Sequence, residues 1–308
     1  MSILAVGTVA FDRIHTPFGQ RDRALGGSAM YITLAARFFS PEPRLVAVVG
    51  RDFPQEYFDV LRDANVDLTG LEVQEDGLTF AWGGRYHYDL NNRDTLYTDL
   101  NVLSTFRPVV PEAHRSSRIL CLGNLDPSVQ SLVLDQMESA ELVICDTMNF
   151  WIENTPDALE QLLARIDCLV INDSEARELS GEPNLIRAAR HIQGKGPRYL
   201  VIKKGEHGAL LFAEDEIFSV PAYPLEDIQD PTGAGDAFMG GFAGYLSACD
   251  TIDRNALKNA LVHGSAVASF CVECFGPERL QSLTLPEILD RISAFRDLTT
   301  IPQAVRLD

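Results

Sequence analysis

The sequence lacks the long apolar segments of a membrane protein and the basic surplus of a nucleic-acid-binding protein. No apolar run approaches the roughly 20 residues that a membrane-spanning helix needs. The apolar opening, residues 1–6, is interrupted at Gly7 and Asp12, which does not fit a secretory signal. The 26 Lys and Arg residues against 44 Asp and Glu residues give a formal net charge of −18. This acidity argues against nucleic-acid polymers and membrane surfaces as partners.

Two common cofactor motifs are also missing. Cys271 and Cys274 have the spacing of metal ligands, but neither a second pair nor a histidine partner accompanies them. The stretch that starts at Gly7 does not supply the Gly-x-Gly-x-x-Gly that a dinucleotide-dependent oxidoreductase carries after its first strand. Most of the six cysteines lie in apolar patterns, which is typical of buried thiols. We therefore expect a protein of the reducing cytoplasm.

Short apolar runs alternate with helical patterns along most of the 308 residues. Continuous apolar runs of this length are typical of buried parallel strands, and short connections favour a βαβ order. We read such strands at residues 3–7, 44–50, 118–123, 142–146 and 167–171. With no internal repeat or linker, the chain is predicted to form one α/β domain over residues 1–308 with a mostly parallel central sheet.

Residues of about 66–105 have a different texture, with alternating polar and aromatic side chains around a Gly-Gly pair. Such alternation predicts a twisted hairpin with one face in solvent or over a ligand. We interpret this segment as a small β lid, to which residues near 12–24 are a further candidate contribution. Its aromatic side chains either pack under the lid or contact a substrate base, and two lids could pair in a homodimer.

The stretch from Asp230 to Asp236, Asp-Pro-Thr-Gly-Ala-Gly-Asp, is a glycine-rich turn that runs into an apolar helix. A helix N-terminus without bulky side chains is a ready anion site, because its unpaired N–H groups and its dipole both favour negative charge. A carboxylate such as Asp236 would repel an anion bound here. Its presence is explained if it acts as a general base that takes the proton from a hydroxyl group attacking the phosphoryl group. The simpler alternative is a glycine-rich loop with an acid in the first helical turn.

This stretch resembles the C-terminal signature of the ribokinase-like (PfkB) family of sugar and nucleoside kinases. The resemblance implies a three-layer α/β/α fold with a small β-sheet lid, and Mg-ATP as the phosphoryl donor. It also implies that Asp236 is the catalytic base and that the amides of Gly233, Ala234 and Gly235 form the anion hole.

A second matching segment is Gly26-Gly27-Ser28, which resembles the N-terminal Gly-Gly motif that contacts the sugar in this family. Asp12 lies just past the end of a buried strand and is expected to hold substrate hydroxyls, a turn-forming role being the alternative. The family pattern usually has asparagine where this chain has Tyr31. The tyrosine is expected to stack on a base or to narrow the sugar pocket, which argues against plain ribokinase or fructokinase specificity.

Further segments are expected to bind the nucleotide. Asn172-x-x-Glu175 follows a strand and resembles the family motif of the magnesium and phosphate network; a helix cap at Asp173 or Ser174 is the plainer interpretation. Glu175 is expected to reach Mg²⁺ through water. The resemblance also implies further contact residues. Those expected to contact the nucleotide are Lys203, Lys204, Gly205, Gly208, Thr232, Gly264 and Ser265. Those expected to contact a monovalent cation such as K⁺ are Asp230 and Gly276. The lysine pair could equally be solvated.

We therefore expect an ATP-dependent kinase that phosphorylates a hydroxymethyl group of a nucleoside. The aromatic lid favours a nucleoside, whose base can stack on aromatic side chains. A sugar kinase of the ribokinase or fructokinase type is the alternative. A catalytically silent family member that acts as a binding subunit is a third possibility, against which the intact Asp236 and Glu175 stand.

Overall fold

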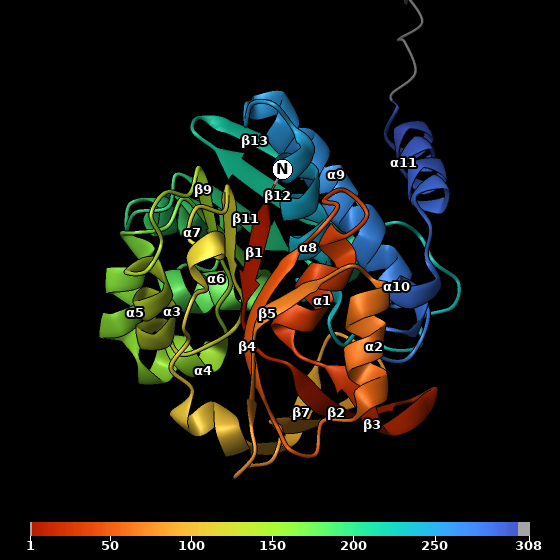
Figure 1. Cartoon of the computed structure of the whole chain (residues 1–308). Coiled ribbons are helices and arrows are strands. Elements are labelled where there is room, and N and C mark those ends of the chain that lie inside the picture. The colour runs from red at the N-terminus through yellow and green to blue at the C-terminus, as the bar shows by residue number, and fades with distance from the viewer. Residues whose placement is uncertain (1, 301–308) are drawn as a thin grey trace, which may run out of the picture.

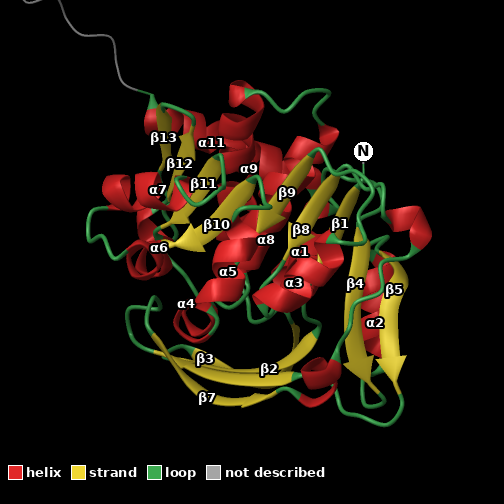
Figure 2. Cartoon of the chain, turned by 90° about the vertical axis from the view of Figure 1, so that its left-hand side faces the viewer, coloured by secondary structure: helices red, strands yellow, loops and turns green. Residues whose placement is uncertain are grey.

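The computed structural model describes residues 2–300 as two sheets with helices packed around the larger one (Figures 1 and 2). The large sheet has nine strands in the order β13-β12-β11-β10-β9-β8-β1-β4-β5. Its strands from β11 to β5 are all parallel, and β12 and β13 continue it as an antiparallel hairpin. In chain order the strands are β1 (Ile3–Val6), β4 (Arg44–Gly50), β5 (Asp67–Gln74), β8 (Ile119–Leu122), β9 (Leu142–Cys145), β10 (Cys168–Asn172), β11 (Tyr199–Lys203), β12 (Ala209–Ala213) and β13 (Glu216–Val220). The predicted mostly parallel sheet is confirmed.

Helices cover both faces of this sheet, because its central strands are apolar on both sides. Along β1, Ile3 and Ala5 face one hydrophobic cluster, and Leu4 and Val6 face the other. The first face is covered by α1 (Ser28–Ala36), α2 (Gln55–Asp63), α8 (Ala234–Ala248), α9 (Arg254–Cys271), α10 (Glu278–Ser282) and α11 (Leu285–Thr299). The second is covered by α3 (Pro127–Leu134), α4 (Asn149–Asn154), α5 (Pro156–Leu163), α6 (Asp173–Ser180) and α7 (Leu185–Gln193). The result is the expected three-layer α/β/α arrangement (Figure 2).

The small sheet has the strand order β3-β2-β6-β7 and draws on two separate parts of the chain. Its strands are β2 (Ala10–Thr16), β3 (Gly19–Gly26), β6 (Ala81–Tyr86) and β7 (Arg93–Asp99). It lies across one end of the large sheet, at the edge toward which the arrowheads of β4 and β10 point (Figure 2). The carboxyl ends of the parallel strands, the usual ligand-binding edge of such sheets, therefore face it.

The expected lid boundary at about residue 66 differs from the structure. Residues 67–74 form β5, which pairs in parallel with β4 at the edge of the large sheet. All the side chains of β5 are half-buried or exposed, which an edge strand permits, so its pattern resembles that of a solvated hairpin. In residues 2–300 no helix combines the length and the apolar character needed to cross a membrane.

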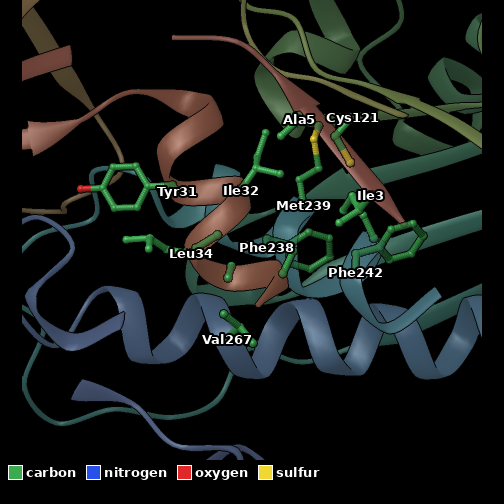
Figure 3. Close-up of a cluster of buried hydrophobic side chains, with 14 of the residues drawn as sticks. Ile3, Ala5, Tyr31, Ile32, Leu34, Cys121, Phe238, Met239, Phe242 and Val267 are labelled. Carbon is green, nitrogen blue, oxygen red and sulfur yellow. The ribbon is translucent and has the colours of Figure 1, made fainter. Parts of the chain in front are cut away.

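Close contact between α1 and α8 depends on glycine. A Cβ at Gly240 would collide with the carbonyl oxygen of Ile32, and one at Gly244 would lie 2.9 Å from Cα of Ala36. The same two helices enclose a dense cluster that includes Phe238, Met239 and Phe242 (Figure 3).

Replacing Gly240 by alanine is expected to lower the free energy of unfolding by about 1–3 kcal/mol, as overpacking of a core usually does. Urea unfolding followed by circular dichroism measures the change. Gly194→Ala is the matched control, since Gly194 has helical backbone angles and its nearest would-be Cβ contact is 3.2 Å. Equal stability of the two variants would contradict the packing role of Gly240.

Candidate active site

The glycine-rich turn before α8 is held by a buried carboxylate. Asp230 is completely inaccessible and accepts hydrogen bonds from the N–H groups of Thr232, at 2.8 Å, and of Gly276, at 2.9 Å. Gly233 follows with φ of 76°, a left-handed conformation that glycine adopts at little cost, and α8 starts at Ala234. The N–H of Ala234 donates to the carbonyl oxygen of Pro231 at 3.2 Å and closes the turn, and the first N–H groups of a helix have no acceptor within the helix, as the sequence predicts for an anion hole.

Asp236 lies in the first turn of α8 and is partly exposed. Its Oδ1 atom is buried and has no hydrogen-bond partner among the described residues. Burial, followed by the negative charge of Asp146, raises the pKa of this carboxyl to about 7, although Lys203 and Arg93 oppose the shift. A carboxyl group that has one buried, unpaired oxygen and titrates near neutral pH is suited to accept a proton.

The ends of three neighbouring parallel strands bring further polar and charged side chains to the same edge of the sheet. Asp146 follows β9, Asn172 ends β10, and Lys203 ends β11. The Nζ atom of Lys203 lies 3.9 Å from Oδ2 of Asp146. A Cβ at Gly235 would be only 2.8 Å from the same Nζ, so this ammonium group lies against the glycine-rich turn.

Asn172 and Glu175 form a reciprocal cap on α6. The Oδ1 atom of Asn172 accepts the N–H of Glu175 at 2.8 Å, and Oε2 of Glu175 accepts the N–H of Asn172 at 2.7 Å. The cap is therefore Asn172 and not Asp173 or Ser174. Burial and the charge of Asp146 raise the pKa of Glu175 to about 7. The motif thus caps a helix and also holds a carboxyl group near Asp146.

The oxygen ligands available here suit Mg²⁺ only in part. Carboxylates at Asp146 and Glu175 are the hard donors that the ion prefers. Within residues 2–300, however, no group of three His, Cys, Asp or Glu side chains has a metal-binding arrangement. These residues fit a Mg²⁺ ion that is held mainly by phosphate oxygens and water.

The predicted acceptor residues Asp12, Gly26 and Gly27 come together. A Cβ at Gly26 would collide with the carboxyl of Asp12, and the backbone N–H of Gly27 donates to that carboxyl. Burial, followed by the charges of Asp230 and Asp236, raises the pKa of Asp12 to about 8. Asp12 is thus a buried hydrogen-bonding group within the electrostatic reach of Asp236.

Ser28 and Tyr31 do not take the expected positions. The Oγ atom of Ser28 accepts the N–H of Thr8 at 3.1 Å, and its own N–H donates to Oγ1 of Thr8 at 2.9 Å, so it fastens α1 to the loop after β1. Tyr31 is 1% exposed, and its ring packs where a Cβ of Gly233 would be. Figure 3 shows its hydroxyl directed away from the cluster around Phe238. A ring this buried has no face free for a base, so the stacking interpretation of Tyr31 is wrong.

The small sheet contributes residues that the sequence did not single out. The Oγ1 atom of Thr232 donates to the hydroxyl oxygen of Tyr86 at 3.2 Å, which joins the small sheet to the glycine-rich turn. Arg93, paired with Tyr86 across the hairpin, opposes the rise in the pKa values of Asp12, Asp236 and Glu175. Its guanidinium group also lies 5.4 Å from the ring centre of Trp82. The only sequence signal for Arg93 is its place in the alternating polar and aromatic segment. Other arginines lie in the same segment, so that signal does not single it out.

The remaining predicted nucleotide contacts are more dispersed. Gly205 and Gly208 have φ of 54° and 82° and allow the tight β11–β12 connection, which supports their predicted turn role. The N–H of Lys204, which follows β11, donates to the carbonyl of Gly208 and closes the same turn. Gly264 packs α9 on α8, since its Cβ would lie 2.8 Å from the carbonyl oxygen of Phe238; the neighbouring Ser265 is buried.

Comparison with known proteins gives the same family as the sequence motifs. The model of the pfkB family carbohydrate kinases matches residues 3–282. A cytidine kinase of Thermococcus kodakarensis is 28% identical over 251 residues, which are 80% of this chain and 88% of that protein. A nucleoside kinase of Methanothermobacter thermautotrophicus is 26% identical over 90% of this chain and 91% of its own.

Solved structures show the same fold. The nucleoside kinase of Burkholderia thailandensis, in complex with ADP-inosine, has a TM-score of 0.81 at 20% identity and covers 99% of this chain and 98% of its own. The nucleoside kinase of Methanocaldococcus jannaschii has a TM-score of 0.77 at 20% identity, with 95% and 98% covered. With Asp236 at the front of α8 and the family model matched over residues 3–282, this chain belongs to the pfkB family of carbohydrate kinases, which transfer phosphoryl groups to hydroxyl groups.

Proposed function

We propose that this protein transfers the γ-phosphoryl group of Mg-ATP to a hydroxymethyl group of a nucleoside. The observation that carries the proposal is the unpaired Oδ1 of Asp236 beside the first N–H groups of α8. A base and an anion hole next to each other are the two parts that phosphoryl transfer to an alcohol requires. The curated relatives named above are a cytidine kinase and a nucleoside kinase, which supports a nucleoside as the acceptor.

In this mechanism each group has a defined task. Asp236 accepts the proton of the acceptor hydroxyl, and the amides of Gly233, Ala234 and Gly235 stabilise charge on the migrating phosphoryl group. Asp12, whose carboxyl group accepts the N–H of Gly27, holds hydroxyl groups of the acceptor. Tyr86 and Arg93 approach from the small sheet, so that sheet is the proposed lid.

Support for the donor comes from structural relatives. An aminoimidazole riboside kinase of Salmonella enterica is described in complex with an ATP analogue, and a putative ribokinase of E. coli in complex with ATP and Mg²⁺. Lys203 and Thr232 are the proposed phosphate contacts, and Ser265 on α9 is the proposed adenine contact. Mg²⁺ would neutralise phosphate charge, held through water by Glu175 and aided by Asp146. The turn at Gly276 is the proposed place for K⁺.

The decisive experiment measures ADP formation with ATP, Mg²⁺ and a panel of nucleosides and free sugars, in K⁺ and in Na⁺ buffers. Higher kcat/KM with a nucleoside than with any free sugar is the expected result. Preference for a pentose or hexose would instead assign a sugar kinase. Thermal shift with each acceptor and a non-hydrolysable ATP analogue is a second readout, because a ligand that binds the native state stabilises it. Acceptor binding without turnover would identify a silent binding subunit.

The pKa of Asp236 also predicts a pH profile. Because that pKa is raised to about 7, the protonated and inactive form accumulates below this pH. We expect kcat/KM for the acceptor to fall about tenfold per pH unit below pH 7 and to level off above it, since this ratio reports the free enzyme. Glu175 titrates near the same pH, so Glu175→Gln is the control. This variant should keep the fall in kcat/KM below pH 7. A flat profile from pH 5.5 to 8 would contradict the role of Asp236.

A further inference from the structure

Lys203 is the one strand-end cation beside the glycine-rich turn in the described part of the chain, and three carboxyl groups act on it. Oδ2 of Asp146 lies 3.9 Å from the Nζ atom of Lys203, and the charges of Glu175 and Asp236 also favour the charged ammonium group. Its position against Gly235 puts this positive charge where a phosphoryl group would sit on the N-terminus of α8.

Asp146 is held in place independently of Lys203. Its Oδ1 accepts the N–H of Thr147 at 2.9 Å. Its backbone carbonyl accepts a hydrogen bond from Nε2 of Gln130 at 3.1 Å, and the same Nε2 donates to the carbonyl of Gly123 at 2.9 Å. Gln130 is completely buried in the layer formed by α3. The second carboxylate oxygen, Oδ2, is thus fixed on the side of Lys203.

The distance between the two charges is informative. At 3.9 Å, Oδ2 of Asp146 attracts the ammonium group but is too far away for a hydrogen bond. The N–H donors of Lys203 are therefore available for a stronger acceptor at the glycine-rich turn. A phosphate oxygen is such an acceptor, and charge-assisted hydrogen bonds to it are about twice as strong as neutral ones.

We propose that Asp146 is a positioning residue that holds the Lys203 ammonium group against the transferring phosphoryl group. This inference rests on the proposed function and adds a role in the transfer step to the nucleotide contact expected of Lys203. In that step the bond from the γ-phosphorus to the bridging oxygen of ATP breaks, and a bond to the acceptor oxygen forms. The acceptor proton goes to Asp236, and ADP leaves with the electron pair of the broken bond. Lys203 stabilises the negative charge on the migrating group while both bonds are partial.

The test compares kcat and the KM for ATP in Asp146→Asn, Lys203→Met and the double variant. Removal of one charge-stabilising donor costs roughly 10²-fold in kcat, which is expected of Lys203→Met. Asp146→Asn should lower kcat by at least about tenfold. Asp146→Glu, which keeps the negative charge, should have a higher kcat than Asp146→Asn. Because Asp146 acts through Lys203, the double variant should be no slower than Lys203→Met. Additive losses, or an unchanged kcat with a raised KM, would overturn the proposal.

Matched controls remove charges elsewhere on the molecule. Lys195 pairs with Glu160 at 2.9 Å and Asp135 pairs with Arg165 at 2.6 Å, both away from α8. Lys195→Met and Asp135→Asn should keep the wild-type kcat. Circular dichroism and thermal unfolding of all variants establish that they fold.

A binding measurement separates this inference from the proposed function. Titration calorimetry of the wild type and of Lys203→Met gives Kd values for ADP and for a non-hydrolysable ATP analogue. We expect Lys203→Met to weaken binding of the analogue by at least about tenfold more than binding of ADP. An equal loss for both nucleotides would overturn the role of Lys203 at the γ-phosphate. If the wild type phosphorylated no acceptor, the proposed function would fail. The Kd values for ADP and for the ATP analogue could still be measured, so the role of Lys203 would be tested separately.

Discussion

Replacing Asp236 by asparagine is expected to lower kcat by roughly 10²–10⁴-fold, the usual loss for a positioned base. Asparagine has nearly the same shape but cannot accept the acceptor's proton. Because Oδ1 of Asp236 has no protein partner, the exchange breaks no hydrogen bond of that atom, and it removes a charge whose burial is unfavourable, so stability near neutral pH should be unchanged or raised. Steady-state kinetics with the best acceptor and thermal unfolding measure the two effects.

The matched control for this variant is Asp215→Asn, in the exposed turn between β12 and β13. It makes the same chemical change far from α8 and should retain wild-type turnover. A nearly normal kcat in Asp236→Asn would remove Asp236 as the base and with it the kinase mechanism. A large loss of stability would assign the residue a structural role instead.

Replacing Gly233 by alanine should inactivate the enzyme and destabilise it by about 2–5 kcal/mol. The left-handed backbone costs a residue with a Cβ about 1–2 kcal/mol. The new methyl group also collides with the buried ring of Tyr31, and overpacking adds about 1–3 kcal/mol. Relief of the collision would turn the N–H groups of the anion hole, so binding of the ATP analogue should weaken as well.

Gly181→Ala isolates the two contributions. Gly181 has φ of 69°, and a Cβ there would meet nothing within 4 Å, so only the backbone cost applies. Urea unfolding of both variants gives the difference that belongs to Tyr31. Equal destabilisation would show that the ring yields to the methyl group, contrary to the tight packing described here.

The sequence predicted the fold well, and it led to a candidate site at one place in that fold, because both rest on local patterns. Apolar runs marked the parallel strands, and polar residues at their carboxyl ends, such as Asn172 at the end of β10 and Asp146 just after β9, lie at one edge of the sheet in any parallel arrangement; Asp12 lies in β2 of the small sheet. The turn before α8 was recognisable because only glycine permits the backbone of Gly233.

What sequence reasoning missed depends on contacts between distant segments. The burial of Tyr31 follows from its packing against Gly233, about 200 residues later, and no local pattern records it. Arg93 reaches the site only because β7 pairs with β6 and the small sheet lies over the strand ends. Asp146 had the right position after a buried strand, but its importance arises from Lys203, two strands away in the sheet.

The composition of the small sheet has a consequence for the order of folding. Its central seam pairs β2 with β6, so that Phe11 meets Ala81 some seventy residues later (81 − 11 = 70). Each excursion that supplies these strands starts and ends in the large sheet or in α1. The entropy of closing so long a loop is offset only once β1, β4 and β5 have assembled. In refolding followed by pulsed hydrogen exchange, amides of the β2–β6 seam should therefore gain protection later than those of β1, and the catalytic surface would be completed last.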